Sequence, residues 1–292
     1  MNRQNQKEKA ELFLKLHQDK EILVLLNSWD PGSSILVEAS GYKAIGTTSM
    51  GISASLDYPD CQTIPFKEML EAIDRIVDKV KVPVTVDIEG GYGKNIQEII
   101  DSTKQLIHTG IVGINIEDSF NLNPKLIDEE DFCTRISAIR ELSTSLGFHL
   151  VINARTDVFI TSSGSPNNRL AEAINRGNKY REAGADCIFV PDVWEIHKIA
   201  ALVNEINAPV NILSNPTNGT GFPPSLGELE DLGVARVSLG SSVMKSTLSL
   251  IKKIADELTQ KGTYNVLSDS LTPMQDTLVA YKMATGSKKN QD

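Results

Sequence analysis

Several features are missing from this 292-residue sequence, and each absence excludes a class of protein. No run of about 18 apolar residues is present, so no transmembrane helix is expected. The first ten residues lack the apolar core of a secretory signal peptide. The three cysteines, Cys61, Cys133 and Cys187, form no CxxC pair, which argues against a disulfide framework or a structural zinc site. We therefore expect a globular, cytoplasmic protein with reduced thiols.

Positive charge is also in short supply. The 29 lysines and arginines are outnumbered by 38 acidic residues, which gives a net charge of -9 and a pI near 5.1. This acidity argues against nucleic acid or an anionic membrane surface as a partner. The apolar share of 40% is ample for a sizeable core. Linkers and low-complexity segments are absent too, so we expect one domain over residues 1–292.

A strand-then-helix pattern repeats eight times between residues 21 and 262. The strands are apolar without a polar face, as a parallel sheet covered on both sides requires. Eight such units predict an α/β fold, a (β/α)₈ TIM barrel; a doubly wound sheet would usually show a GxGxxG after its first strand, and none is present. The expected strands are 21–26, 43–49, 82–89, 111–118, 150–157, 187–192, 210–215 and 235–240, followed by helices at 30–40, 65–80, 95–108, 128–146, 167–183, 194–206, 225–232 and 241–261.

Segments outside the barrel are expected at both ends. Residues 1–20 are predicted to hold a short amphipathic helix before the barrel of residues 21–262. Residues 263–292 are predicted to hold a further helix, at 272–284, followed by a polar tail.

The third expected strand ends in two carboxylates, Asp87 and Glu89. Successive side chains alternate faces on a strand, so these two point the same way. They repel each other unless a cation or a shared proton relieves them, and oxygen ligands suit Mg²⁺ or Mn²⁺. A solvated acidic strand end is the alternative. The glycines at 90, 91 and 93 are expected to let the backbone turn sharply and approach a ligand.

Other polar residues also fall at strand ends, where barrel enzymes carry their chemistry. Glu117 adds a third carboxylate, which favours the metal interpretation. Arg155 is a permanent bidentate donor that suits a substrate carboxylate or phosphonate; a buried ion pair with Glu117 is the alternative. None of the four histidines falls at such a position, so structural or surface roles are expected for them. Further polar strand ends are Asn27, Thr47–Ser49, Asn115, Asn153, Asp192 and Asn215.

Four segments, taken in order, resemble the phosphoenolpyruvate mutase/isocitrate lyase superfamily. They are residues 41–60, 87–93 (Asp-Ile-Glu-Gly-Gly-Tyr-Gly), 113–119 and 153–157 (Asn-Ala-Arg-Thr-Asp). The resemblance implies a Mg²⁺-dependent barrel that makes or breaks a C–C or C–P bond of a 2-oxo or 2-hydroxy carboxylate through an enolate. The branch that the sequence resembles is commonly labelled carboxyvinyl-carboxyphosphonate phosphorylmutase.

The resemblance also implies roles for particular residues. The metal would be served by Asp87, Glu89 and Glu117, some of them through bound waters, and Asp60 would complete that network. The enolate oxygen would be held by backbone amides near Thr48 and Ser49, and a carboxylate by Arg155. Asn215, at the end of the seventh expected strand, is a further candidate for substrate binding. The family tends to exchange its last helix between subunits, so the helix at 272–284 implies a homo-oligomer, a dimer or a tetramer.

The loop at 119–131 departs from the lyases of this family. Those lyases resemble one another in a Lys-(Lys/Arg)-Cys-Gly-His segment, which is absent here. Mutases carry Lys and Asn in this loop, so Lys125 and Asn123 are the candidate acid/base residues, although their order and spacing differ. Three functions therefore stay open: a mutase, a C–C lyase, decarboxylase or hydrolase acting on an oxaloacetate-like or methylmalate-like acid, and a non-catalytic carboxylate-binding protein.

Overall fold

The structure is a computed structural model that describes residues 3–120, 123–161, 165–216, 222–272 and 281. Within these residues nine strands form one parallel sheet, in the order β1-β11-β10-β9-β8-β5-β4-β3-β2. The strands are β1 (Leu23–Leu25), β2 (Asn27–Ser28), β3 (Ile45–Thr47), β4 (Val84–Asp87), β5 (Gly113–Glu117), β8 (Val151–Arg155), β9 (Cys187–Val190), β10 (Val210–Leu213) and β11 (Arg236–Ser238).

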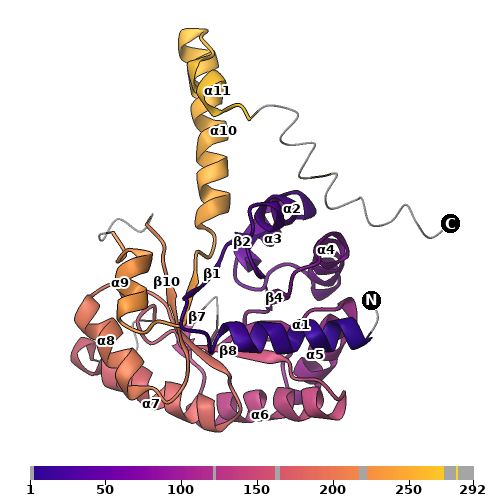
Figure 1. Cartoon of the computed structure of the whole chain (residues 1–292), viewed down its shortest axis with the longest axis vertical. Helices are drawn as coiled ribbons and strands as arrows, with labels where there is room; N and C mark the ends of the chain where they lie inside the picture. Colours follow the sequence, from indigo (N-terminus) through magenta and orange to yellow (C-terminus); the bar gives the residue numbers. More distant parts are fainter. Residues whose placement is uncertain (1–2, 121–122, 162–164, 217–221, 273–280, 282–292) are drawn as a thin grey trace, which may run out of the picture.

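The sheet closes on itself because its first and last members are one stretch of chain. β1 pairs with β11 and β2 pairs with β3, while only Leu26 separates β1 from β2. Each of the eight expected strand regions contains part of this sheet, which confirms the predicted TIM barrel. The helices around it are α2 (Pro31–Ala39), α3 (Ser49–Ser55), α4 (Phe66–Lys79), α5 (Ile96–Thr109), α6 (Glu129–Ser145), α7 (Arg169–Glu182), α8 (Ile196–Glu205) and α9 (Leu226–Asp231). The helix expected at 241–261 forms as α10 (Ser242–Lys261), but it does not cover the sheet as an eighth barrel helix, because it points outward (Figure 1).

The main apolar core lies between the sheet and the surrounding helices. On β5, Ile114 and Ile116 are fully buried in this core, and Asn115 between them points to the other face, into the barrel. The strands therefore do have a polar face, contrary to the sequence interpretation. It was missed because single polar residues are inconspicuous in short apolar runs.

Local signals set the helix boundaries as the sequence predicts. Asp30 and Ser33 form a reciprocal capping box at the start of α2, where Pro31 occupies the first turn. The Asn95 side chain accepts a hydrogen bond from the Glu98 backbone N–H at the start of α5. These contacts satisfy backbone donors that a helix start otherwise leaves unpaired.

Two elements occupy segments that were expected to be loops. The helix α3 begins after Thr48, whose hydroxyl accepts a hydrogen bond from the Gly51 backbone N–H. The strands β6 (Ser119–Phe120) and β7 (Asn123–Leu126) form an antiparallel pair within the loop that follows β5. Both are short elements, held by caps and pairings that weak local periodicity does not reveal.

The expected N-terminal helix is α1 (Arg3–Leu16), and it covers the N-terminal end of the barrel. Phe13 is fully buried, and its ring lies so close to Gly113 that a Cβ there would be 2.8 Å from Phe13 Cε1. Burial lowers the pKa of His17, just after this helix, to about 4. That histidine is therefore a neutral packing residue at neutral pH.

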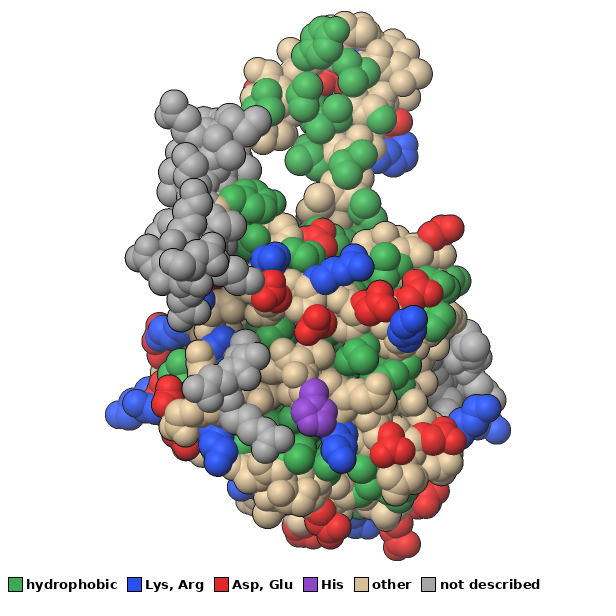
Figure 2. All heavy atoms as spheres, turned by 90° about the vertical axis from the view of Figure 1, so that its right-hand side faces the viewer, with side chains coloured by type: hydrophobic (Ala, Val, Ile, Leu, Met, Phe, Trp, Pro, Cys, Tyr) green, Lys and Arg blue, Asp and Glu red, His purple; other side chains and the backbone are tan. Residues whose placement is uncertain are grey.

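The C-terminal helix α10 projects away from the barrel, and α11 (Asn265–Ser270) lies at its far end (Figure 1). Figure 2 shows apolar side chains gathered on this projection, and Leu248 and Ile251 are more than half exposed. The helix expected at 272–284 lies outside the described residues, apart from Thr272 and Tyr281. Of the described helices, none has the length and apolar character needed to cross a bilayer.

Candidate active site

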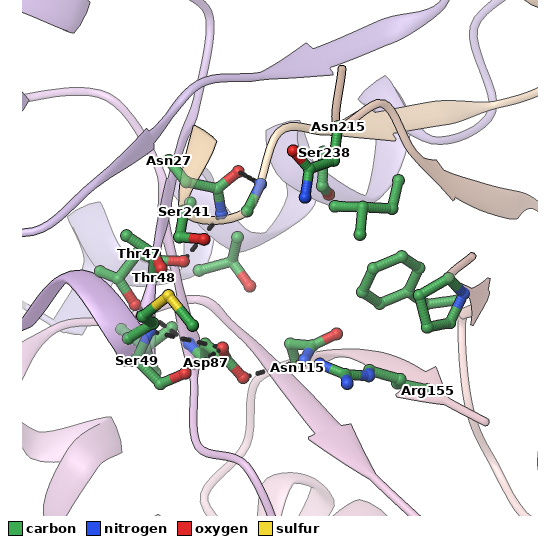
Figure 3. Close-up of a pocket in the computed structure, with 18 of the residues that line it drawn as sticks. Asn27, Thr47, Thr48, Ser49, Asp87, Asn115, Arg155, Asn215, Ser238 and Ser241 are labelled. Atoms are coloured by element: carbon green, nitrogen blue, oxygen red, sulfur yellow. Dashed lines mark hydrogen bonds between the residues drawn. The ribbon is translucent and has the colours of Figure 1, made fainter. Parts of the chain in front are cut away.

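A cavity of about 230 Å³ lies at the C-terminal ends of the strands (Figure 3). Six of the residues to which the sequence assigns a role line it: Thr48, Ser49, Asp60, Asp87, Arg155 and Asn215. Three of the further polar strand ends, Asn27, Thr47 and Asn115, line it as well. Together they come from six different strand ends and the loops that follow them. The barrel has therefore brought together side chains that are up to 188 residues apart in sequence (215 − 27).

Asp87, the last residue of β4, is oriented by neighbours on both sides. Its Oδ2 accepts a hydrogen bond from Ser49 Oγ at 2.7 Å, and its Oδ1 accepts one from Asn115 Nδ2 at 2.9 Å (Figure 3). Asn115 is in turn held by Asn153, whose Nδ2 donates to Asn115 Oδ1 at 2.8 Å. Such outer contacts fix the direction in which a carboxylate presents its remaining lone pairs.

Glu89 and Glu117 do not line the cavity, although both were expected to serve a metal. Each is only 3% exposed. Burial, with smaller contributions from Asp87 and Asp60, raises the pKa of Glu89 to about 8. Burial also raises the pKa of Glu117 well above its ordinary value. The cluster therefore binds a proton more readily than isolated carboxylates do, or takes a cation in its place.

The carboxylates at this site suit a metal ion that has few direct protein ligands. Among the described residues no three Asp, Glu, His or Cys side chains are arranged to hold a metal directly. Asp87 and Asp60 line the cavity, and the two buried glutamates are near enough for the charge of Asp87 to raise the pKa of each. Mg²⁺ commonly binds proteins through one or two carboxylates and keeps several waters. The oxygen-rich cluster fits Mg²⁺ in that form, in which most of the coordination runs through water.

Arg155 forms an ion pair with Glu117 and also lies at the cavity, so its position fits both roles that the sequence left open. Its Nη1 lies 2.9 Å from Glu117 Oε2, and its Nε donates to Asp157 Oδ1 at 2.6 Å. It also lines the cavity, with its guanidinium 5.8 Å from the centre of the Phe189 ring. Burial alone would lower the pKa of Arg155, but the charges of Asp157 and Glu117 outweigh it and raise the pKa. The side chain is thus a rigid, permanently charged donor at the cavity wall.

Strained backbone is concentrated in the two loops beside these carboxylates. Cys61, Gln62, Glu89 and Tyr92 all have left-handed φ angles, between 50° and 77°. The loops are joined, because Gln62 Oε1 accepts a hydrogen bond from the Gly90 backbone N–H at 3.1 Å. Each left-handed residue costs on the order of 1–3 kcal/mol, and such strain clusters at functional sites.

The glycines after β4 make the sharp turn that was expected, but they do not line the cavity. Gly91 has a φ of 99°, which side-chain-bearing residues rarely adopt. A Cβ at Gly93 would lie 2.5 Å from the Ile99 backbone nitrogen. The close approach at Gly93 is to the start of α5, and an approach of these glycines to a ligand stays a prediction.

The two backbone amides expected at the substrate differ in availability. Thr48 N–H donates to the Ser28 carbonyl at 3.0 Å, so it is already engaged. Ser49 N–H has only a long contact of 3.4 Å to Asp87 Oδ2 and remains the candidate donor. On the opposite wall, Asn215 Oδ1 accepts a hydrogen bond from Ser242 Oγ at 2.7 Å.

Lys125 lies outside the cavity. It is exposed on β7 and lines a separate cleft with Arg169 and Arg176. Asn123 contributes its backbone to the same strand. The loop candidates for acid/base chemistry therefore stay predictions.

Sequence reasoning missed several residues that line the cavity, among them Thr85, Arg236 and Lys245. Lys245 lies in the first turns of α10, just after the last strand. Arg236 is the charged residue of β11, two positions before Ser238 on the same face. A charge at an inward-facing position of a buried strand was the signal that could have identified it.

Comparison with known proteins gives one consistent family. A sequence profile of the phosphoenolpyruvate phosphomutase family matches residues 13–259. An uncharacterized protein of Mycobacterium tuberculosis is 35% identical over 78% of this chain and 81% of its own. A 2-methylisocitrate lyase of Halalkalibacterium halodurans is 26% identical over 89% of this chain and 85% of its own.

Solved structures are similar along almost the whole chain. A crystal structure from Burkholderia cenocepacia J2315, described as that of a lyase/mutase, has a TM-score of 0.86 at 29% identity, over 94% of this chain and 96% of its own. Phosphonopyruvate hydrolase in complex with oxalate and Mg²⁺ has a TM-score of 0.79 at 20% identity, over 97% of this chain and 99% of its own. At that identity, the second likeness concerns the fold alone.

Proposed function

The chain belongs to the phosphoenolpyruvate phosphomutase family, and from that premise we propose that it is a Mg²⁺-dependent enzyme acting on a small 2-oxo or 2-hydroxy carboxylate. The reaction makes or breaks a C–C or C–P bond through an enolate. One observation carries the proposal: Asp87 is held by Ser49 and Asn115 at the wall of a cavity that Arg155 also lines. A cation site and an anion-binding arginine on one small cavity suit a carboxylate that becomes an enolate.

Mg²⁺ would be held directly by Asp87 and through water by Asp60, Glu89 and Glu117. When bound, the ion supplies stabilisation of the negative charge that develops on the enolate oxygen. The protein's own contribution is positional. Ser49 N–H is placed to donate to that oxygen, and Arg155, fixed by Glu117 and Asp157, is placed to hold a carboxylate.

The specific reaction has two candidates. Phosphoryl transfer of the carboxyvinyl-carboxyphosphonate phosphorylmutase type is favoured by the family itself. Cleavage of a C–C bond, as by a lyase, decarboxylase or hydrolase, is favoured by the apolar part of the cavity lining, which suits the hydrocarbon substituents of a methylmalate-like acid. That part includes Met50, Ile160, Phe189, Pro191 and Leu213.

Analysis of the products formed in the presence of Mg²⁺ separates these reactions. Pyruvate indicates a C–C lyase, a decarboxylase or a phosphonate hydrolase, and oxalate with acetate indicates hydrolysis of oxaloacetate. A mutase rearranges its phosphonate without releasing pyruvate. The substrates to compare are oxaloacetate, methylisocitrate, dimethylmalate, phosphonopyruvate and carboxyphosphonoenolpyruvate. Release of pyruvate from a C–C substrate identifies a lyase or decarboxylase, whereas turnover of a phosphonate alone identifies a mutase or phosphonate hydrolase. Failure to turn over any of them, together with tight oxalate binding, identifies a non-catalytic binding protein.

The hairpin after β5 is proposed to supply the acid/base. Replacing Lys125 and Asn123 together with Ala is expected to reduce turnover at least about 100-fold, the usual contribution of a positioned acid or base. Binding of Mg²⁺ and oxalate should be unchanged, because Lys125 does not line the cavity. The measurement is kcat beside an oxalate titration. The matched control is Lys104→Ala, an exposed lysine on α5. Full activity of the double variant would remove the hairpin from the mechanism.

We also propose that the protein is cytoplasmic, because the reducing conditions there suit its three free thiols.

We further propose that the chain forms a homo-oligomer through its projecting C-terminal helices. Leu248 and Ile251, 52% and 57% exposed, would be buried in that contact. Replacing both with Glu should raise the dissociation constant at least about 100-fold, since each buried side chain contributes roughly 1.5–3 kcal/mol. Analytical ultracentrifugation measures this, with Lys253→Glu on the same helix as the control. An unchanged mass distribution would contradict the proposed contact.

A further inference from the structure

The inner end of the cavity contains a buried arginine with no acidic partner. Arg236, the first residue of β11, lines the cavity and is only 3% exposed. Its Nε has one long hydrogen bond, 3.4 Å to Ser238 Oγ, and its Nη1 is buried without a partner. Burial lowers the pKa of Arg236 to about 10, so the side chain is still charged at neutral pH.

Three other arginines of the described chain form ion pairs where they are buried or partly buried, whereas Arg169, which is only partly buried, forms none among the described residues. Arg155 contacts Glu117 and Asp157, Arg176 contacts Asp118 and Glu172, and Arg140 contacts Asp186. Arg236 forms no such ion pair among the described residues. A buried, unpaired charge destabilises a folded protein, so its presence indicates a use other than stability.

A second donor without a partner lines the same cavity. Thr85 on β4 is 2% exposed, and its Oγ1 is buried with no hydrogen-bond partner. A hydroxyl and a guanidinium with unused N–H and O–H groups together suit a carboxylate, which accepts hydrogen bonds at both oxygens.

The two groups lie deeper in the barrel than the proposed metal site. Thr85 and Arg236 precede Asp87 and Ser238 by two residues on their strands and face the same way. At about 3.3 Å per residue this places them roughly 5–7 Å further in, allowing for strand tilt. That depth matches the carbon chain of a short dicarboxylate.

We propose that Arg236 and Thr85 form a carboxylate subsite at the inner end of the cavity, which binds the second carboxylate of a dicarboxylate substrate. The first carboxylate lies beside Asp87 and Arg155, so the inference rests on the proposed function for that end of the ligand. The subsite selects four-carbon dicarboxylic acids over monocarboxylic acids of equal length.

The test compares malate with 2-hydroxybutyrate, two four-carbon 2-hydroxy acids in which a carboxylate replaces a methyl group. Calorimetric titration of the full chain in saturating Mg²⁺ is expected to show malate binding about 30–100-fold more tightly, the effect of hydrogen bonds to a charged group. In Arg236→Met the preference should fall to within about 3-fold, while the affinity for 2-hydroxybutyrate is retained. Arg236→Lys should restore part of the preference, and Thr85→Val should reduce it.

Thermal unfolding without ligand tests a purely structural role. The melting temperature of Arg236→Met should equal or exceed that of the parent, because an unpaired buried charge is removed. A lower melting temperature with equal weakening of both acids would overturn the proposal. So would a persistent malate preference with tighter Mg²⁺ binding, which would make Arg236 a counter-charge for Asp87.

These measurements distinguish a failure of the proposed subsite from a failure of the proposed enzymatic function. An Arg236-dependent malate preference in a protein that turns over none of the five substrates supports the subsite and refutes catalysis of those reactions. Turnover of a monocarboxylate or phosphonate substrate that is insensitive to Arg236→Met supports the enzyme and refutes the subsite.

Discussion

Replacing Asp87 with Ala is expected to lower Mg²⁺-dependent turnover by about 10³-fold or more, because a metal ion contributes several kcal/mol of transition-state stabilisation. Asp87 is the strand-end carboxylate that both lines the cavity and is held by Ser49 and Asn115. Neither Glu89 nor Glu117 reaches the cavity to replace it. The measurement is kcat/KM as a function of Mg²⁺ concentration, on whichever substrate proves active.

The matched control is Asp74→Ala, which removes an exposed aspartate from α4. It should leave turnover and the Mg²⁺ dependence unchanged. Asp87→Ala itself should not lower the melting temperature greatly, because it removes a charge that raises the pKa of Glu89. Turnover by Asp87→Ala within 10-fold of the parent would refute the assignment of the metal site.

Replacing Asp118 with Ala is expected to reduce the free energy of unfolding by about 3–5 kcal/mol, the cost of breaking a buried ion pair from one side. Asp118 is fully buried, and its Oδ2 accepts hydrogen bonds from Thr156 Oγ1, Tyr180 Oη and Arg176 Nη1 at 2.8, 2.6 and 3.2 Å. Its Oδ1 accepts one from the Asp157 backbone N–H at 2.8 Å. Removal of the carboxylate would leave Arg176 without this buried partner.

Equilibrium unfolding in urea measures this loss. Asp101→Ala, at an exposed site on α5, is the control and should change stability by less than about 0.5 kcal/mol. Asp118→Asn keeps an acceptor oxygen but loses the charge, so its free energy of unfolding should lie between those of the parent and Asp118→Ala. A loss below about 1 kcal/mol in Asp118→Ala would show that the network contributes little.

Much of the architecture was predictable because it is encoded locally. The alternation of apolar strands with capped helices is visible residue by residue, as at Asp30 and Asn95. The short elements were not predictable. The helix α3 depends on the Thr48 cap, and β6 and β7 depend on each other.

The candidate site was predictable in its residue types and not in its geometry. Alternation along a strand places Asp87 and Glu89 on one face, but it does not reveal that Glu89 is buried in a left-handed turn. Likewise, the sequence identified Arg155 as a hydrogen-bond donor for an anion. Only the structure showed that it pairs with Asp157 as well as with Glu117.

By itself, the sequence determined the barrel, the strand ends that carry polar residues and the family. These follow from periodicity, caps and motifs, which act over a few residues. Only the tertiary structure decided which groups face one cavity, which carboxylates lie behind it and which buried arginine has no partner. Burial, desolvation and pairing arise when β4, β5, β8 and β11 close around a common interior, and no local pattern contains that closure.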